Sequence, residues 1–170
     1  MLLLGLGSSL SSNFGNRFKN IDLAISYLQS HKIQLLKKSS FYETLSYPDI
    51  KNPKFINVVI GVSTHLSPEE FASVLISIEE TLERKRDQKN EPRTCDIDII
   101  DYNGKVMNFI YKRLIFKVPH EKLIYRNFVL FPLQEIAPNW IHPITKEKIS
   151  NLIAKLSEED RKSILKVKKN

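Results

Sequence analysis

A strand, a helix and a second strand follow one another in residues 55–100, FINVVIGVSTHLSPEEFASVLISIEETLERKRDQKNEPRTCDIDII. The first ten residues of this stretch are dense in β-branched and apolar side chains, which is typical of a central strand. Ser67 precedes Pro68, and Glu70 completes a capping box, so we predict a helix over 67–86. Its apolar residues recur at helical spacing and predict one buried stripe: Phe71, Val74, Leu75, Ile78 and Leu82.

The second strand, TCDIDII at residues 94–100, carries Asp96 and Asp98 inside an otherwise apolar run. Successive residues of a strand point to opposite faces, so the two carboxylates share one face while Cys95 and Ile97 share the other. The carboxylates then stand about 7 Å apart. Two like charges that approach each other in a confined site need a cation, and a divalent metal ion is the obvious candidate. A bare D-x-D pattern also suits the solvated face of an amphipathic strand, so other residues have to decide.

Strands and a helix are also predicted on the N-terminal side of this unit. Residues 2–6 predict a first strand, residues 17–29 a helix, and residues 32–43 a further extended segment. The resulting order is βαββαβ. Two helices of this kind pack on one face of an antiparallel sheet, so we predict an α/β (α+β) protein with the ferredoxin-like arrangement.

The C-terminal part adds elements to that frame. After the strong turn signal Asn103-Gly104, we predict an extended segment from about residue 109 and short helices around 132–138. The length of the chain suits one core. We therefore expect a single domain over residues 1–156 and a charged, frayed C-terminal tail over 157–170.

Composition favours an anionic partner. The chain has 170 residues, of which 42% are hydrophobic, with a formal net charge of +7 and a pI of about 9.4. A positive charge suits nucleic acid, a nucleotide or a phosphorylated metabolite. The single cysteine excludes an intramolecular disulfide and fits a reducing cytosol, and we find neither a secretory signal nor a membrane-spanning segment. We expect a cytoplasmic protein with no membrane partner.

Basic residues lie on both sides of the Asp strand. Arg84, Arg86 and Arg93 precede it, and a loop that enters a strand can fold over that strand's exposed face. Arg binds phosphate through planar, bidentate contacts. Metal-binding carboxylates and mobile Arg groups are the parts that phosphoryl transfer requires. Farther along, His120 and Arg126 are further candidates for phosphate contacts.

Several motifs occur in one order over residues 2–140: GLGSSL, SSFYET, FINVVIGV, IEETLERKR, PRTCDIDII and VPHEKLIYRNFVLFPLQEIAP. Together they resemble the 6-hydroxymethyl-7,8-dihydropterin pyrophosphokinase family of folate biosynthesis. The combination of PRT-x-D-x-DI, VPH and a downstream R-x-F is specific. The resemblance implies a ferredoxin-like enzyme that transfers the β,γ-pyrophosphoryl unit of ATP to the pterin hydroxymethyl oxygen and releases AMP. It also implies two Mg²⁺ ions held by the paired aspartates.

The resemblance assigns roles to individual residues. The catalytic set is Arg84, Arg93, Asp96 and Asp98, of which Asp96 and Asp98 hold the metal ions. The ATP-binding set is Arg84, Arg86, Arg93, His120 and Arg126. The pterin-binding set is Gly7, Thr44, Phe55, Asn57 and Phe128. Here the Asn57 amide suits the pterin edge, and the two aromatic rings sandwich the pterin. The partners would be ATP and the pterin alone, with no nucleic acid, and we expect a monomer.

Three positions depart from the family pattern. Ser9 stands in place of an Asn and Glu83 in place of a Gly. The segment from Arg113 to the VPH motif carries two extra residues, so no ATP-binding role is transferred to Arg113.

Two other functions remain open on the sequence. A basic βαββαβ domain can bind nucleic acid, although residues 55–62 lack an RNA-binding aromatic pattern. The paired aspartates could also serve a two-metal nuclease or nucleotidyltransferase. The nearest further carboxylate, Asp101, has the opposite strand parity.

Overall fold

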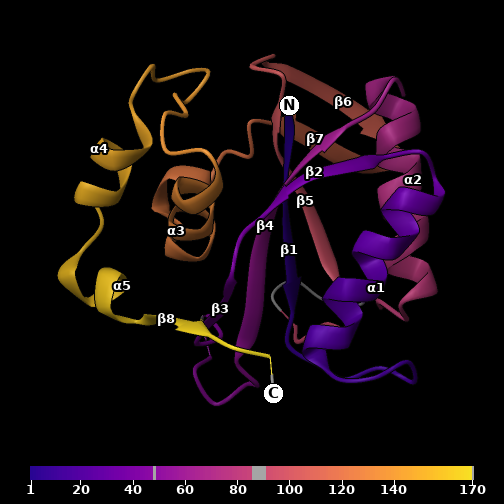
Figure 1. Ribbon diagram of the computed structural model, residues 1–170, viewed down its shortest axis with the longest axis horizontal. Coiled ribbons are helices and arrows are strands. Elements are labelled where there is room, and N and C mark those ends of the chain that lie inside the picture. The colour runs from indigo at the N-terminus through magenta and orange to yellow at the C-terminus, as the bar shows by residue number, and fades with distance from the viewer. Residues whose placement is uncertain (48, 86–90, 170) are drawn as a thin grey trace.

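An antiparallel sheet forms the centre of the molecule. The computed structural model describes residues 1–47, 49–85 and 91–169 (Figure 1). The main sheet has the strand order β5-β1-β4-β3-β8, and β2 pairs with β4 beside β3. The strands are β1 (Leu2–Ser8), β2 (Gln34–Lys38), β3 (Phe41–Thr44), β4 (Phe55–Ser63), β5 (Asp96–Tyr102) and β8 (Ile164–Val167).

Helices cover the sheet on two sides. In Figure 1 the sheet is seen nearly edge-on, with α1 and α2 on its right and α3 and α4 on its left. A separate hairpin of two strands lies beside α2. These elements are α1 (Arg17–Ser30), α2 (Pro68–Thr81), α3 (Asn127–Ile136), α4 (Ile149–Ala154), α5 (Glu158–Lys162), the 3₁₀ turn η1 (Leu123–Tyr125), and the hairpin strands β6 (Met107–Tyr111) and β7 (Leu114–Val118).

The predicted ferredoxin-like arrangement is confirmed. The βαββαβ order occurs with α1 and α2 on one face, and the capping box at Ser67 and Glu70 forms with both of its hydrogen bonds. Leu2, Leu4 and Leu6 of β1 point into the core between the sheet and the helices α1 and α2. Alternation along the strand then sends Leu3, Gly5 and Gly7 to the opposite face.

That opposite face has two different halves. Its apolar half contains Leu3, Val59 and Ile100, which pack under α3 and α4 in a second core. The other half of the same face carries the small or polar residues Gly7 and Asn57, and it is here that the site lies.

Some element boundaries differ from the sequence prediction. The extended segment over residues 32–43 divides into β2 and β3, because Ser39 replaces a regular ladder partner and accepts the Val59 N–H through its Oγ at 3.0 Å. The helix predicted over 67–86 ends at Thr81. Beyond its C-cap, Glu83 adopts a left-handed φ of 66° that turns the chain away.

The C-terminal half differs more. Residues 107–118 form a hairpin rather than one extended segment, and its turn consists of Lys112 and Arg113, both with positive φ. In place of short helices around residues 132–138, a single helix α3 starts at Asn127 and contains Pro132.

The expectation of a frayed C-terminal tail is wrong. The segment after Leu156 forms α5 and β8, and β8 pairs with β3 at the edge of the sheet. A four-residue strand gains order from a partner strand, which local sequence patterns do not reveal.

The loop after β1 is joined to the loop before β5 through Asn20. This α1 residue is fully buried. Its Nδ2 donates to Leu10 O at 3.0 Å and to Thr94 O at 3.1 Å, and its Oδ1 accepts from Ser12 Oγ at 2.6 Å. One buried amide thus fixes the chain on both sides of the site.

Asn20→Ala should lower the free energy of unfolding by about 2–3 kcal/mol, because the three hydrogen bonds of a fully buried amide are lost. Urea unfolding of the ligand-free chain measures the change. Asn108→Ala is the matched control, since Asn108 is exposed on β6, and its effect should stay within about 0.5 kcal/mol. Equal effects of the two substitutions would contradict the role of Asn20.

Candidate functional site

The site is built on neighbouring positions of three paired strands. Gly7 of β1 lies opposite Asn57 of β4 on one side and opposite Asp96 of β5 on the other. Gly5, two residues earlier, lies opposite Asp98. Because residues directly opposite each other share a face, the register alone brings both aspartates and Asn57 to one surface.

A pocket wall forms around Gly7. A Cβ atom at this position would lie 3.4 Å from Asn57 Oδ1 and 3.6 Å from a ring carbon of Phe55. Asn57 is buried, and its Nδ2 donates to Thr44 Oγ1 at 3.0 Å. Of the predicted pterin-binding set, Gly7, Thr44, Phe55 and Asn57 therefore lie together.

Phe128 comes from a different element, the first turn of α3. It is half-buried against the second core, and its ring centroid lies 5.4 Å from the guanidinium carbon of Arg126. The other predicted aromatic residue, Phe55, lies near Arg93, whose guanidinium carbon is 5.9 Å from the Phe55 ring centroid. Each predicted aromatic residue thus has a predicted phosphate-binding Arg beside it.

The two aspartates differ in their surroundings. Asp96 accepts from Arg84 Nη1 at 2.6 Å and from Arg93 Nη1 at 2.7 Å. Asp98 faces Arg126 Nη1 at the longer distance of 3.5 Å, and its side chain is 40% exposed. Asp96 is therefore well neutralised in this structure, whereas Asp98 opens to solvent on one side.

Electrostatics separate the two carboxyl groups further. Loss of solvation inside the protein raises the pKa of Asp98, and the negative charge of Asp96 adds to this increase. The positive charges of His120 and Arg126 act in the opposite direction without cancelling this effect. The ion pair with Arg126 thus does not offset the effects that raise the pKa of Asp98.

Glu79 is a site residue that the sequence reasoning missed. It is almost fully buried on α2, where its carboxylate accepts the Ile97 N–H at 2.7 Å and pairs with Arg84 Nη1. Burial alone would lower the pKa of Arg84, but Asp96 and Glu79 outweigh it and raise the pKa above its ordinary value. The signal was a carboxylate one helical turn after the buried Leu75.

Ser8 and Ser9 were also missed as supports of the Arg93 segment. Ser8 Oγ donates to Thr94 O at 2.6 Å, and Ser9 Oγ accepts the Arg93 N–H at 2.9 Å. The Ser9 N–H donates in turn to Arg93 O at 2.9 Å. The motif that follows Gly7 therefore holds the backbone from which the Arg93 side chain reaches Asp96.

Cys95 lies beneath this segment on the helix-covered side. The side chain is fully buried. Burial raises the pKa of its thiol well above the ordinary value, and the charges of Glu79 and Asp96 add to the effect. Such a thiol is a packing group, as its strand parity predicted.

His120 and Arg126 approach the aspartates from the other side. His120 Nδ1 accepts the Lys122 N–H at 3.1 Å, which leaves Nε2 to carry the proton of the neutral ring, 3.5 Å from Arg126 Nη1. Burial lowers the pKa of His120, and Arg126 lowers it further, against the opposing charge of Asp98. A hollow borders this His and is lined by Ile115, Lys117, His120 and Glu121.

Arg113 and Arg86 were also considered from the sequence. Arg113 is exposed in the turn between β6 and β7. Arg86, predicted to bind ATP, lies outside the described residues.

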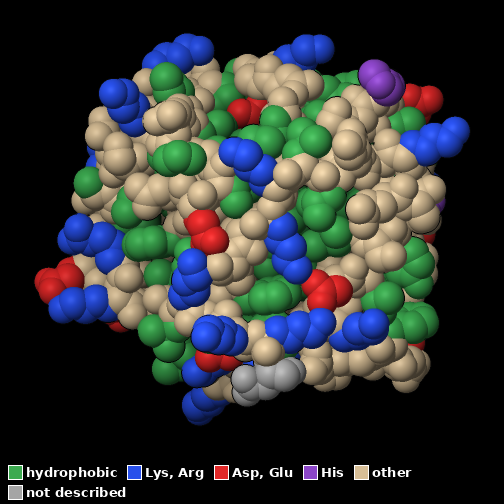
Figure 2. Space-filling view, viewed as in Figure 1, with side chains coloured by type: hydrophobic (Ala, Val, Ile, Leu, Met, Phe, Trp, Pro, Cys, Tyr) green, Lys and Arg blue, Asp and Glu red, His purple; other side chains and the backbone are tan. Residues whose placement is uncertain are grey.

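The molecular surface carries many cations. In Figure 2, Lys and Arg side chains outnumber Asp and Glu on the visible face and gather along its lower part. Among the described residues, no helix is long and apolar enough to cross a membrane.

Comparisons with known proteins give a consistent set of matches. Residues 3–138 match the family model described as 7,8-dihydro-6-hydroxymethylpterin-pyrophosphokinase (HPPK). The 2-amino-4-hydroxy-6-hydroxymethyldihydropteridine pyrophosphokinase of Aquifex aeolicus is 36% identical over 146 residues, covering 86% of this chain and 86% of the relative. The folic acid synthesis protein fol1 of Pneumocystis carinii is 37% identical over 157 residues, or 92% of this chain.

The matched proteins differ in length. The chain spans about a fifth of the fol1 proteins, with 21% of the Pneumocystis carinii protein and 20% of the Schizosaccharomyces pombe protein covered. Among solved structures, wild-type HPPK-DHPS of Plasmodium falciparum matches with a TM-score of 0.70 at 16% identity, over 91% of this chain and 44% of that one. The fold is thus shared with one part of a larger protein. With the family model covering most of its length and the Aquifex aeolicus relative matching nearly end to end, this chain belongs to the 7,8-dihydro-6-hydroxymethylpterin-pyrophosphokinase family.

Proposed function

We propose that this chain transfers the pyrophosphoryl group of ATP to 6-hydroxymethyl-7,8-dihydropterin, giving AMP and the pterin diphosphate in folate biosynthesis. One observation carries the proposal. The paired aspartates lie between two groups of cations, Arg84 with Arg93 and His120 with Arg126, directly beside the Asn57 pocket. The Aquifex aeolicus relative, a 2-amino-4-hydroxy-6-hydroxymethyldihydropteridine pyrophosphokinase, supports the same activity.

The pocket around Gly7 suits a flat heterocycle. Asn57 offers a buried amide whose free acceptor suits the donors of a pterin edge. Phe55 and Phe128 supply aromatic faces for the ring, and Gly7 leaves the space in front of Asn57 open. The polar groups would fix the orientation of the ring, so that the hydroxymethyl arm points toward the aspartates.

Asp96 and Asp98 would hold two Mg²⁺ ions. Within residues 1–47, 49–85 and 91–169, no group of three or more His, Cys, Asp or Glu side chains is placed so that it could hold a metal ion by itself. This suits Mg²⁺, which is usually held by one or two carboxylates, with phosphate oxygens and waters as its other ligands. Bound there, the ions would neutralise the triphosphate and polarise its β-phosphorus.

The Arg residues would exchange partners when ATP binds. Arg84 and Arg93 now neutralise Asp96, and a phosphate group offers each guanidinium an equivalent bidentate partner. Glu79 would keep Arg84 directed at the site during this exchange. From the other side, the His120 Nε2–H and Arg126 would donate to the phosphates, so that the chain stabilises charge on both sides of the transferring group.

The reaction would form a bond between the pterin hydroxymethyl oxygen and the β-phosphorus. The bond from the β-phosphorus to the oxygen of AMP breaks, and the hydroxyl proton leaves to solvent. Positioning and charge stabilisation carry such a transfer, because the chemistry needs no covalent enzyme intermediate.

The alternative functions have less support. A nuclease or nucleotidyltransferase of the two-metal kind would gain from a third carboxylate, and Asp101 is instead buried with Trp140 Nε1 donating to it at 2.7 Å. We also propose that the chain acts as a monomer on small molecules in the cytoplasm, where a free, buried thiol such as that of Cys95 suits the reducing conditions.

The reaction of ATP, Mg²⁺ and the hydroxymethyl pterin should yield AMP and no ADP, because transfer of a pyrophosphoryl unit breaks the bond at the β-phosphorus. Chromatography of the nucleotides after the reaction measures the ratio. A mixture without pterin is the control and should release no AMP. ADP as the main product would overturn the proposed reaction.

Asp98→Asn should reduce turnover by about a thousandfold or more, because a metal ligand is lost. A carboxyl group whose pKa is raised in the folded chain destabilises that chain at neutral pH, so the same substitution should raise the melting temperature of the ligand-free protein. Glu80→Gln, exposed on α2, is the control and should leave turnover unchanged. Full activity of Asp98→Asn would exclude the proposed metal site.

Arg93→Ala should lower kcat by about a hundredfold to a thousandfold. Binding of a non-hydrolysable ATP analogue should weaken far less, because this Arg already has a carboxylate partner before ATP arrives. Arg113→Ala removes the same group from the exposed hairpin turn and should change neither quantity. Similar losses from both substitutions would mean that only the overall charge matters.

A further inference from the structure

The C-terminal segment lies beyond the family match yet makes contacts next to the site. The family model ends at residue 138, while α5 and β8 lie within residues 157–169. We call residues 157–169 the clasp. In Figure 1 it runs from α5, on the α3 side of the molecule, along the lower edge to β3.

The first contact of the clasp is with β3. Ile164 of β8 lies opposite Thr44, and Lys166 lies opposite Tyr42. Thr44 also lies opposite Phe55 on its other side and accepts from Asn57. The clasp therefore pairs with the strand that forms one wall of the proposed pterin pocket.

The second contact is with the start of α3. Asn127 is buried, and its Nδ2 donates to Asp160 O at 2.6 Å and to Ser163 Oγ at 3.0 Å. Asn127 stands between Arg126 and Phe128, which we assign to phosphate and pterin. The clasp is thus hydrogen-bonded to the backbone segment that carries the opposite wall.

The two ends of α3 are attached in different ways. Its C-terminal end joins the sheet directly, because Glu135 accepts from Ser40 Oγ and from Tyr42 Oη, both at 2.8 Å. Its N-terminal end is joined to β3 through the clasp and Asn127. The clasp is therefore a second hydrogen-bonded connection between α3 and β3, at the end of α3 that carries Phe128.

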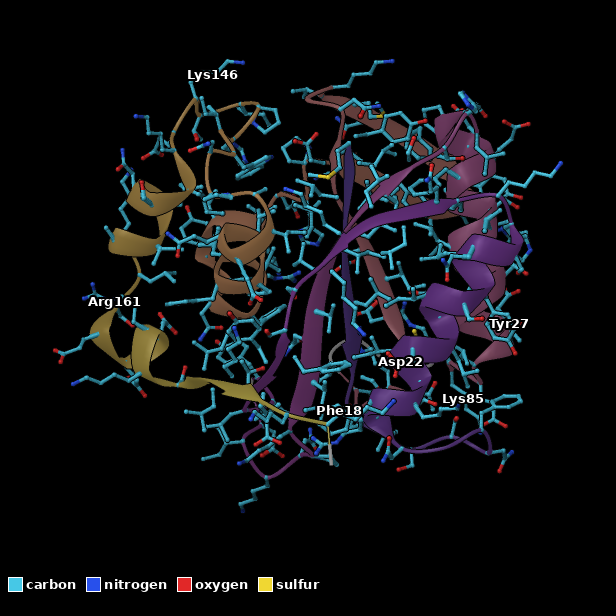
Figure 3. All side chains as sticks on the ribbon, viewed as in Figure 1. Phe18, Asp22, Tyr27, Lys85, Lys146 and Arg161 are labelled. Atoms are coloured by element: carbon cyan, nitrogen blue, oxygen red, sulfur yellow. The ribbon has the colours of Figure 1, made fainter. Side chains whose placement is uncertain are left out.

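Surface ion pairs hold the far end of the clasp. Lys166 Nζ lies 3.5 Å from Glu135 Oε2, and Lys169 Nζ lies 2.5 Å from Asp22 Oδ2. Asp22, labelled in Figure 3, belongs to α1 on the other side of the sheet. These pairs hold β8 in register against β3.

We propose that the clasp sets the spacing between the two walls of the pterin pocket, with Asn127 as its positioning residue. This inference rests on the proposed function. A pocket for a flat ring depends on the separation of its aromatic faces, so a supporting element that fixes this separation acts on pterin affinity. Asp96, Arg84 and Arg93 lie on β5 and in the loop before it, away from the hydrogen bonds of the clasp, whereas Arg126 directly precedes Asn127, so pterin affinity should fall more than ATP affinity.

Asn127→Asp tests the proposal, because it keeps the size of the side chain and removes both donated hydrogen bonds. Isothermal titration should show Kd for the hydroxymethyl pterin raised by about tenfold. Kd for a non-hydrolysable ATP analogue with Mg²⁺ should rise less than Kd for the pterin, and KM for pterin should rise more than kcat falls. Asn151→Asp, exposed on α4, carries the same change of charge and should leave all four quantities unchanged.

The outcomes are distinguishable. The proposal is overturned if the binding of both ligands weakens equally. It is also overturned if a folded variant binds the pterin as tightly as the unaltered chain does. If Asn127→Asp does not fold, Lys166→Ala combined with Lys169→Ala decides: raised Kd for pterin supports the proposal and an unchanged value overturns it. If the unaltered chain binds no pterin, the proposed function itself fails and the clasp falls with it.

Discussion

The pairing of β1 with both β4 and β5 is the interaction on which the rest of the site depends. Gly7 lies on the middle strand, with Asn57 opposite it on one side and Asp96 on the other, and it has no side chain to cover the space between them. Strand alternation sends Leu4 and Leu6 into the helix-covered core at the same time. A shift of one residue in this register would exchange the two faces and bury the carboxylates among apolar side chains.

Much of this arrangement could be predicted from the sequence because it depends on local periodicity. The capping box of α2, the parity of Asp96 and Asp98 and the βαββαβ order all follow from spacings of two to four residues. The fold class is confirmed for the same reason. The grouping of Gly7 with Asn57 needed the family resemblance, since strand register cannot be derived from one strand at a time.

The features that escaped prediction depend on distant partners or on unusual backbone conformations. The β6–β7 turn uses Lys112 and Arg113 at positive φ, where a turn signal would require Gly or Asn. β8 is short and rich in Lys, and it becomes a strand only because the edge of β3 is free to receive it. Glu79 was overlooked because a carboxylate on a helix is normally solvated, and its buried partners lie on β5 and in the following loop.

The burial of Cys95 gives the chain a thiol that reports on its own opening. Cys95 is the only cysteine, and it lies between the Arg93 loop and the strand that carries Asp96 and Asp98, buried under α2. A thiol reagent can reach it only when β5 separates from the helix layer, so the rate of modification follows that separation rather than surface chemistry. Spectroscopic labelling can therefore time the local unfolding of the site strand in the unaltered sequence, without any engineered probe.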